Sequence, residues 1–205
     1  MPTAIATAIE KAGVVGAGGG GFPTHVKASG NADIVLANGA ECEPLLRADS
    51  ELMVRSPKRV LRGLTLIRDS VGASRAIVAL KDRNKRAISA LSAAAADEDS
   101  VEVLVLSNVY PAGDEFLLVY ESTGRVTPEG GFPLDVGVVV SNVTTLTQIA
   151  DAAEGRPVTR RLVTVQGEVS SPATFDVPIG TATGELLELA GIKDATSCSV
   201  IVGGP

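Results

Sequence analysis

Hydrophobic residues follow two alternating patterns over the first three quarters of the chain. Short runs rich in Val, Ile, Leu and Ala predict buried strands at residues 32–37, 76–80, 101–106 and 136–140. Between these runs, apolar residues spaced along one helical face predict helices at 58–71, 84–96, 115–121 and 142–153. Strands and helices in alternation, with crossovers of this length, predict an α/β fold with a mostly parallel sheet and helices on both faces.

The pattern changes after residues 154–157, a polar Glu-Gly-Arg-Pro segment that we interpret as a linker. The segment beyond it predicts strands at 162–168 and 174–179, a short helix at 183–190 and a further strand at 198–202. A hairpin, a helix and a returning strand outline a small β-grasp unit that stops before its sheet is complete. We therefore expect two domains, 1–155 and 156–205, with the second truncated and the chain an N-terminal fragment.

Composition excludes several classes of protein. Hydrophobic residues make up 45% of the 205 residues, enough for a buried core and too many for a disordered chain. A net charge of −6 and only 3% aromatic residues argue against nucleic-acid binding. The two cysteines, Cys42 and Cys198, cannot ligate an iron–sulfur cluster by themselves. No apolar stretch is long enough to span a bilayer and no export signal begins the sequence, so we expect a cytoplasmic protein.

The most informative segment is the glycine-rich stretch at residues 13–27. It contains six glycines, each about 0.5–1 kcal/mol costlier than alanine in conformational freedom, which disfavours a plain connector. Bare main chain lets N–H groups approach an anion, and Lys27 adds a positive charge. The segment lacks the Gly-Lys-Ser/Thr ending of a nucleoside-triphosphate loop. A Gly-x-Gly-x-x-Gly string is present, but residues 4–11 before it look helical rather than extended, so a flexible surface loop stays open as the alternative.

Three more polar segments each follow a predicted strand: residues 38–44, 110–115 and 141–145. Ligands bind outside the carboxyl ends of strands in open parallel sheets, so we expect these segments to converge on one edge. Asn38 can hydrogen-bond the edge of a heterocycle, while Glu41 and Glu43 would need a cationic partner or raised pKa values to share an apolar pocket. The alternative for the two glutamates is a solvated acidic turn beside Arg47.

Four motifs carry a resemblance that covers nearly the whole chain: GAGGGGFPTHVK (16–27), ANGAECEP (37–44), YPAGDE (110–115) and SNVTTL (141–146). In this order they resemble the flavoprotein subunit of respiratory complex I and its relatives. The NGAECEP form resembles that of the C subunits of Rnf electron-transport complexes and of PduS-type cobalamin reductases, since complex I prefers Asp at Ala40. Rnf C subunits carry a domain before the glycine loop, so the early loop here favours the reductase-like arrangement.

Two departures from the family pattern bear on these expectations. Gly20 stands where relatives usually have Ala, which only removes a methyl group. The cysteine sets that follow the β-grasp domain in relatives are absent, so [4Fe–4S] clusters are expected only in a longer chain.

The resemblance implies a Rossmann-like domain that binds FMN and NADH, followed by a soluble-ligand-binding β-grasp domain. The residues it assigns to FMN are Gly16, Gly18, Gly19, Lys27, Asn38, Glu41, Asn142 and Thr145. Phe22, Glu43 and Glu115 would border NADH. No side chain need act as acid or base, and no metal ligand is implied.

The implied activity is electron transfer from NADH to FMN and on to iron–sulfur clusters or a corrinoid, as in cobalamin reduction during propanediol utilisation. The implied partners are an iron–sulfur or corrinoid protein, with a bacterial microcompartment or a second copy of the chain as further associates. Three alternatives stay open: a flavin- or corrinoid-binding scaffold without turnover, a structural subunit, and the NADH-input subunit of a membrane Rnf-type complex.

Overall fold

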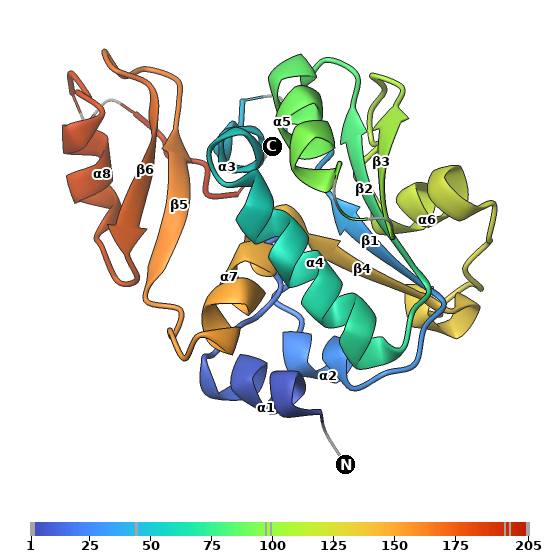
Figure 1. The fold of residues 1–205 in the computed structure, drawn as a ribbon. Coiled ribbons are helices and arrows are strands. Elements are labelled where there is room, and N and C mark those ends of the chain that lie inside the picture. Colours follow the sequence, from blue (N-terminus) through green and yellow to red (C-terminus); the bar gives the residue numbers. More distant parts are fainter. Residues whose placement is uncertain are drawn as a thin grey trace.

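Four parallel strands form the central sheet of the computed structural model, which describes residues 3–43, 45–96, 98, 100–194, 196 and 198–203 (Figure 1). The strands are β1 (Ile34–Asn38), β2 (Arg75–Lys81), β3 (Val101–Leu106) and β4 (Val138–Asn142). Their order across the sheet is β3-β2-β1-β4, and every neighbouring pair is parallel. The predicted parallel α/β sheet is confirmed, and the order is Rossmann-like.

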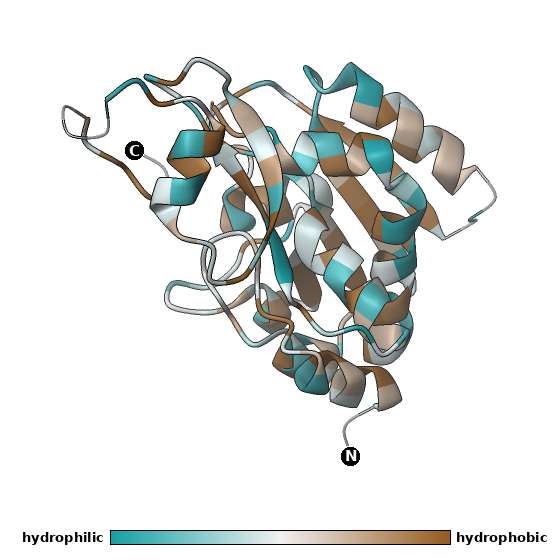
Figure 2. Cartoon of the chain, turned by 90° about the vertical axis from the view of Figure 1, so that its left-hand side faces the viewer, coloured by the Kyte–Doolittle hydropathy of each residue, from teal (hydrophilic) through white to brown (hydrophobic). Residues whose placement is uncertain are grey.

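Helices cover both faces of this sheet. One face carries α4 (Pro57–Val71), α5 (Lys85–Ala95) and α7 (Val143–Ala153), and the other carries α6 (Glu115–Thr123) (Figure 1). Figure 2 shows hydrophobic central strands behind helices whose outer turns carry hydrophilic residues. β1 and β4 bury nearly every side chain because both faces are covered, so they are continuous apolar runs.

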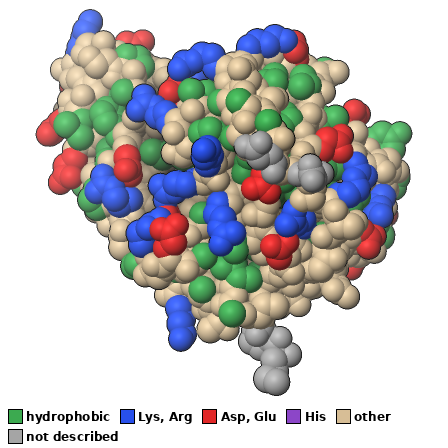
Figure 3. All heavy atoms as spheres, viewed as in Figure 1, with side chains coloured by type: hydrophobic (Ala, Val, Ile, Leu, Met, Phe, Trp, Pro, Cys, Tyr) green, Lys and Arg blue, Asp and Glu red, His purple; other side chains and the backbone are tan. Residues whose placement is uncertain are grey.

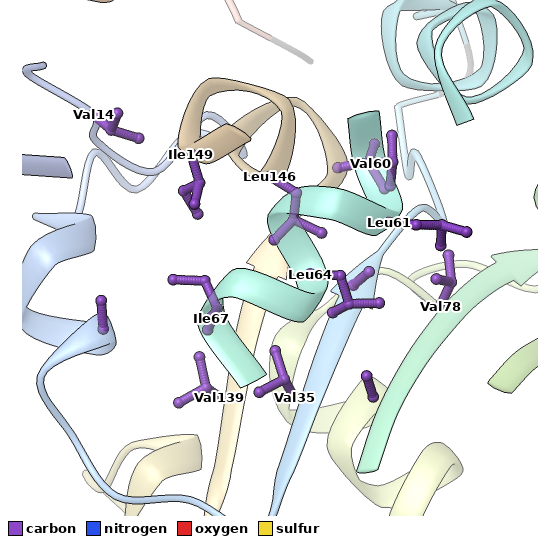
Figure 4. Close-up of a cluster of buried hydrophobic side chains, with 14 of the residues drawn as sticks. Val14, Val35, Val60, Leu61, Leu64, Ile67, Val78, Val139, Leu146 and Ile149 are labelled. Atoms are coloured by element: carbon purple, nitrogen blue, oxygen red, sulfur yellow. The ribbon is translucent and has the colours of Figure 1, made fainter. Parts of the chain in front are cut away.

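The larger part of the core lies between α4, α7 and the sheet. Leu64 and Ile67 of α4 lie beside Leu146 and Ile149 of α7, above valines of the strands (Figure 4). All four side chains are fully buried. Gly63 lets the two helices approach this closely, because a Cβ there would lie 1.9 Å from the carbonyl oxygen of Leu146.

Two short helices flank the glycine loop. Helix α1 (Ala4–Lys11) begins at Thr3, whose hydroxyl accepts a hydrogen bond from the Ala6 N–H, and α2 (Thr24–Ala28) follows the loop. The prediction that a helix rather than a strand precedes the loop is confirmed.

The structure corrects the expected elements at two places in this part of the chain. Helix α3 (Ala48–Arg55) was not predicted, because its sequence is largely polar and Met53 is its one buried residue. The strand expected to begin at Val136 begins at Val138. Residues Pro133–Val136 form a 3-10 turn instead, and Gly137 closes it in the left-handed conformation at φ 71°.

A second, two-stranded sheet follows in the chain. Strands β5 (Arg160–Val165) and β6 (Ala173–Pro178) are antiparallel, and α8 (Thr183–Leu189) packs beside them (Figure 1). The strand expected at 198–202 is wrong: these residues pair with no strand, and the side chains of Ile201 and Val202 are 73% and 86% exposed. A β-branched run becomes a strand only when it pairs with the edge of a sheet, and residues 198–202 do not pair with either sheet of the described chain.

Among the residues that the structure describes, no helix is both long enough and apolar enough to cross a membrane.

Candidate functional site

The carboxyl edge of the sheet has a reversal of strand order between β1 and β4. The last residues of these strands, Asn38 and Asn142, are register partners, so their side chains start from neighbouring positions. β2 and β3 lie on one side of this point and β4 on the other. Open α/β sheets bind ligands outside the strand ends at such a reversal. The edge therefore is the candidate site.

The glycine loop is a hairpin whose main chain faces open space. Val15 and Pro23 form an antiparallel bridge at its base, and the Gly16 N–H donates to the Phe22 carbonyl at 2.9 Å. Gly19 and Gly21 have φ values of 107° and 57°, conformations that side chains with a Cβ disfavour. A Cβ at residues 19, 20 or 21 would meet no atom within 4 Å. A ligand can thus approach the main chain here closely.

The loop is fixed to the first turn of α7. The Ala17 N–H donates to the Thr145 hydroxyl oxygen at 2.9 Å. A Cβ on Gly18 would lie 3.5 Å from the Cβ of Asn142, so the loop passes directly beside the end of β4. The predicted convergence of the glycine loop on the sheet edge is thus present in the fold.

Lys27 brings a positive charge to the same place. Its Nζ donates to the Val140 carbonyl of β4 at 2.9 Å and lies 5.4 Å from the centre of the Phe22 ring. Burial lowers the pKa of Lys27 below its ordinary value, and the nearby carboxylate of Glu115 partly offsets this. The Phe22 ring in turn pairs with Phe132, with the ring centres 6.4 Å apart.

Asn38 joins the acidic turn to the segment after β3. Its Nδ2 donates to the Gly113 carbonyl at 2.8 Å, and its Oδ1 accepts from the Ala40 N–H at 3.1 Å. The Gly113 N–H donates to the sulfur of Cys42 at 2.9 Å. A Cβ on Gly113 would lie 2.7 Å from that sulfur, so a side chain there would separate the two segments.

The Glu41 side chain, expected to face a cofactor, contacts the start of α3. Its carboxylate accepts from the Asp49 N–H at 2.9 Å and from the Ser50 hydroxyl at 2.6 Å. A carboxylate at a helix N-terminus satisfies free N–H groups and interacts favourably with the helix dipole. Glu41 also has φ 42°, a conformation uncommon for a residue with a side chain.

Asp49 is a site residue that sequence reasoning missed. Its carboxylate accepts from the Asn142 Nδ2 at 2.6 Å and from the Thr144 hydroxyl at 2.8 Å. Burial raises the pKa of Asp49 above its ordinary value, although these two hydrogen bonds act in the opposite direction. The available signal was an acidic residue at the start of an unrecognised helix.

The structure therefore brings together most of the residues singled out in the sequence. The glycine loop, Lys27, Asn38 and the pair Asn142 and Thr145 all lie at the carboxyl edge. Glu115 lies close enough to act on the pKa of Lys27. Glu43 is partly buried in the turn that follows Asn38, with no hydrogen bond to this group among the described residues. No set of three or more His, Cys, Asp and Glu side chains within the described chain is placed to hold a metal ion.

Comparison with known proteins identifies relatives over nearly the whole chain. Cobalamin reductase PduS of Salmonella typhimurium is 46% identical over 198 residues, which are 96% of this chain and 44% of the reductase. The C subunit of the Na⁺-translocating ferredoxin:NAD⁺ oxidoreductase complex of Acetobacterium woodii is 39% identical, over 98% of this chain and 47% of that subunit. This chain thus spans less than half the length of these curated relatives.

A solved structure shows the same fold. The NAD⁺-reducing [NiFe]-hydrogenase in its air-oxidized state contains a chain that matches with a TM-score of 0.81 and 31% identity. The match covers 94% of this chain and 39% of the hydrogenase chain. The model of the Nuo51 FMN-binding domain matches residues 9–151, which run from within α1 to within α7. The chain belongs to the Nuo51 FMN-binding domain family.

Proposed function

We propose that this chain binds FMN at the carboxyl edge of its parallel sheet and serves NADH-dependent electron transfer. The observation that carries the proposal is the bare main chain of residues 18–21 beside Asn142 at the reversal of strand order. The family match and the likeness to proteins whose names include NAD⁺ as a substrate support it. The domain division expected at residue 155, with a β-grasp domain after it, belongs to the same proposal.

The open side of the glycine loop fits a bulky anionic cofactor. Gly19, Gly20 and Gly21 leave space where side chains would project, so their main chain can contact a ribityl phosphate. The Gly16 N–H already donates to Phe22, so Gly16 would contribute its lack of a side chain rather than a donor. Gly18 and Gly19 remain the candidate donors of the loop.

Each side chain around the loop would have a separate role in FMN binding. Lys27 would place a positive charge near the phosphate, since an ammonium has three donors and the Val140 carbonyl uses one of them. Thr145 would hold the loop in place through the Ala17 N–H, and Asn142 would close the phosphate end. Asn38 would face the ring system from β1. Glu41 would act mainly by fixing the turn that follows Asn38, because its carboxylate contacts α3.

A second group of side chains would border NADH. Phe22 is 37% exposed at the exit of the loop, where its ring can cover a nicotinamide. Glu43 and Glu115 would limit the approach of the dinucleotide from the acidic turn and from the start of α6. The chemistry that bound FMN supplies is acceptance of a hydride from NADH and release of the two electrons one at a time. The protein's own residues align the two partners and exclude water.

The electron acceptor is the least constrained part of the proposal. The relatives' names indicate two possible redox partners, a cobalamin and a ferredoxin. We propose a cobalamin-reducing role, because of the 46% identity to a cobalamin reductase. The cytoplasmic location expected from the sequence stays a prediction.

The deciding experiment is to titrate the purified chain with FMN and then add NADH without oxygen, following flavin absorbance. Bleaching of the flavin band supports the oxidoreductase. Binding without bleaching supports a flavin-binding scaffold without turnover. Failure to bind FMN contradicts the proposal and favours a structural role for the glycine loop.

A further inference from the structure

A cavity of about 330 Å³ lies between α3 and α5, and none of its lining residues is assigned to the flavin. Nine residues line it: Arg47, Ser50, Glu51, Val54, Arg83, Asn84, Lys85, Arg86 and Ala87. They come from α3 and the residue before it, from the start of α5 and from the turn that follows β2. Figure 3 shows Lys and Arg side chains around the upper part of the face where Figure 1 places α3 and α5.

The cavity has more positive charge than its carboxylates neutralise. Four of its lining side chains are cationic and one, Glu51, is anionic. Glu51 is shared by two arginines, at 3.3 Å from Arg55 and 3.7 Å from Arg86. Lys85 pairs with Asp82 outside the cavity. Such a surplus is unusual in a chain whose net charge is −6.

Two of the arginines pair with no carboxylate of the described chain. Arg83 donates to the main-chain carbonyl of Glu41 at 3.2 Å. Arg47 forms no ion pair with the residues that the structure places. A guanidinium carries five N–H donors in a planar fork that matches two phosphate oxygens, so each retains donors for a ligand.

A second feature of the cavity is an unused polar group at the start of α5. The Nδ2 of Asn84 is buried and has no hydrogen-bond partner among the described residues. Asn84 is also the N-cap of α5, yet its side chain accepts no hydrogen bond from the helix. A buried amide donor without a partner costs about 1–3 kcal/mol, and a turn of this side chain toward the cavity would remove that cost by giving Nδ2 an acceptor on a ligand.

We propose that this cavity is a binding site for a phosphate-bearing anion. The two arginines would grip phosphate oxygens, the Asn84 amide would donate a third hydrogen bond, and the start of α5 would add its dipole. The volume is at the small end of ligand pockets, and none of the nine lining residues is aromatic. Recognition would therefore rest on the phosphate groups, whether these belong to free pyrophosphate or to a nucleotide.

The cavity is connected to the carboxyl edge of the sheet through Glu41. The Ser50 hydroxyl lines the cavity and donates to the Glu41 carboxylate, while Arg83 contacts the Glu41 carbonyl. The proposal itself does not depend on flavin binding, because no cavity residue is assigned to FMN.

The test is calorimetric titration of the chain with inorganic pyrophosphate at saturating FMN, which blocks binding at the glycine loop. The main variant is Asn84→Asp, which replaces the unused donor by a negative charge. Asp is a good N-cap, so this variant is expected to fold at least as well as the parent. A second variant, Arg47→Gln/Arg83→Gln, removes two charges from the cavity. Its matched control, Lys11→Gln/Arg62→Gln, removes two charges from exposed positions on α1 and α4.

We expect saturable binding that weakens about tenfold or more in both cavity variants and less than twofold in the control. Equal weakening in the control and the double variant would show non-specific attraction and overturn the proposal, as would absence of saturable binding in the parent chain.

ADP in place of pyrophosphate distinguishes the two sources of phosphate. Equal affinities indicate a site that recognises phosphate alone, and much tighter ADP binding indicates a nucleotide. Failure of FMN to bind would be seen separately in the flavin fluorescence, and the comparison of the cavity variants with the control would still decide whether pyrophosphate binds in the cavity.

Discussion

The hydroxyl oxygen of Thr145 accepts a hydrogen bond from the main-chain N–H of Ala17 at 2.9 Å, across 128 residues of sequence. Thr145 is buried in the first turn of α7, whereas Ala17 begins the turn of the glycine loop. This one bond fixes the most open segment of the chain to one of its best-packed helices. The position of the loop is therefore set by the core beneath it.

Thr145→Val keeps the shape of the side chain and removes the acceptor. We expect the loop to open more often, with amide hydrogen exchange at residues 17–20 faster by about fivefold for the loss of about 1 kcal/mol. FMN affinity should fall with it. The control is Thr147→Val, because the Thr147 hydroxyl is also buried but contacts only the Thr144 carbonyl of its own helix. Equal exchange rates in the two variants would contradict the role given to Thr145.

Lys27→Ala tests the phosphate contact. If a charge-assisted bond from Lys27 contributes about 1.5–3 kcal/mol, FMN affinity should fall by a factor of about ten or more. Quenching of flavin fluorescence on titration measures the affinity. Lys58→Ala, at an exposed position of α4, should leave it unchanged. An unaltered affinity in the Lys27 variant would remove this lysine from the site.

Glu115→Gln should change the pH dependence of that affinity. The carboxylate of Glu115 raises the pKa of Lys27 against the larger lowering by burial, so its removal should lower this pKa further. FMN affinity in the parent chain should decline on the alkaline side as Lys27 loses its proton, and in the variant the decline should begin at lower pH. Glu121→Gln on the same helix is the control. Coincident pH profiles for all three proteins would exclude the coupling.

Asp49→Asn should alter stability in the acid range. Burial raises the pKa of Asp49, so the folded chain keeps this proton to higher pH than the unfolded chain does. Between about pH 4 and the raised pKa the folded state binds more protons, and ionisation of Asp49 lowers the free energy of unfolding as pH rises. The amide side chain of the Asp49→Asn variant cannot ionise in this pH range. The Tm of the parent minus that of the variant should therefore decrease as pH rises through this window.

The control for this measurement is Asp69→Asn, a largely exposed carboxylate on α4. Its Tm difference from the parent should not show the same decrease. If the difference in Tm between the parent and the Asp49→Asn variant is constant with pH, the buried carboxylate does not titrate in the way proposed.

Sequence patterns predicted β1, β2 and β4 well because these strands are buried on both faces. A run such as residues 34–37 has no polar position that a helix or loop would need, so the pattern has one interpretation. The 198–202 run is also rich in β-branched residues and is not a strand, since strand formation depends on a partner edge that local sequence does not encode. Helix α3 was not predicted, because a helix with one buried residue has no periodic pattern of apolar residues.

Some residues of the candidate site could likewise be predicted from sequence, and others could not. The glycine loop and the polar strand ends could be identified from residue types and from their position after predicted strands. Asp49 could not, because its role depends on a contact with Asn142, 93 residues away, and on a helix that the pattern did not reveal. The cavity between α3 and α5 was hidden for the same reason, since half of it belongs to that helix.

Gly63→Ala tests how closely the core beneath the site is packed. The added Cβ would lie 1.9 Å from the Leu146 carbonyl oxygen and 2.5 Å from its carbonyl carbon, which are main-chain atoms that cannot rotate away. Helices α4 and α7 would have to separate, so we expect a loss of about 1–3 kcal/mol or more in the free energy of unfolding. Gly184→Ala is the matched control: it lies in α8 with a negative φ, and its new Cβ would meet nothing within 4 Å. That variant should gain about 0.5–1 kcal/mol from helix propensity.

Chemical denaturation of both variants measures the difference in their free energies of unfolding, and similar stabilities would show that the two helices yield to an added methyl group. Because α7 carries Thr145, a separation of α4 and α7 should also weaken FMN binding, whereas Gly184→Ala should leave it unchanged.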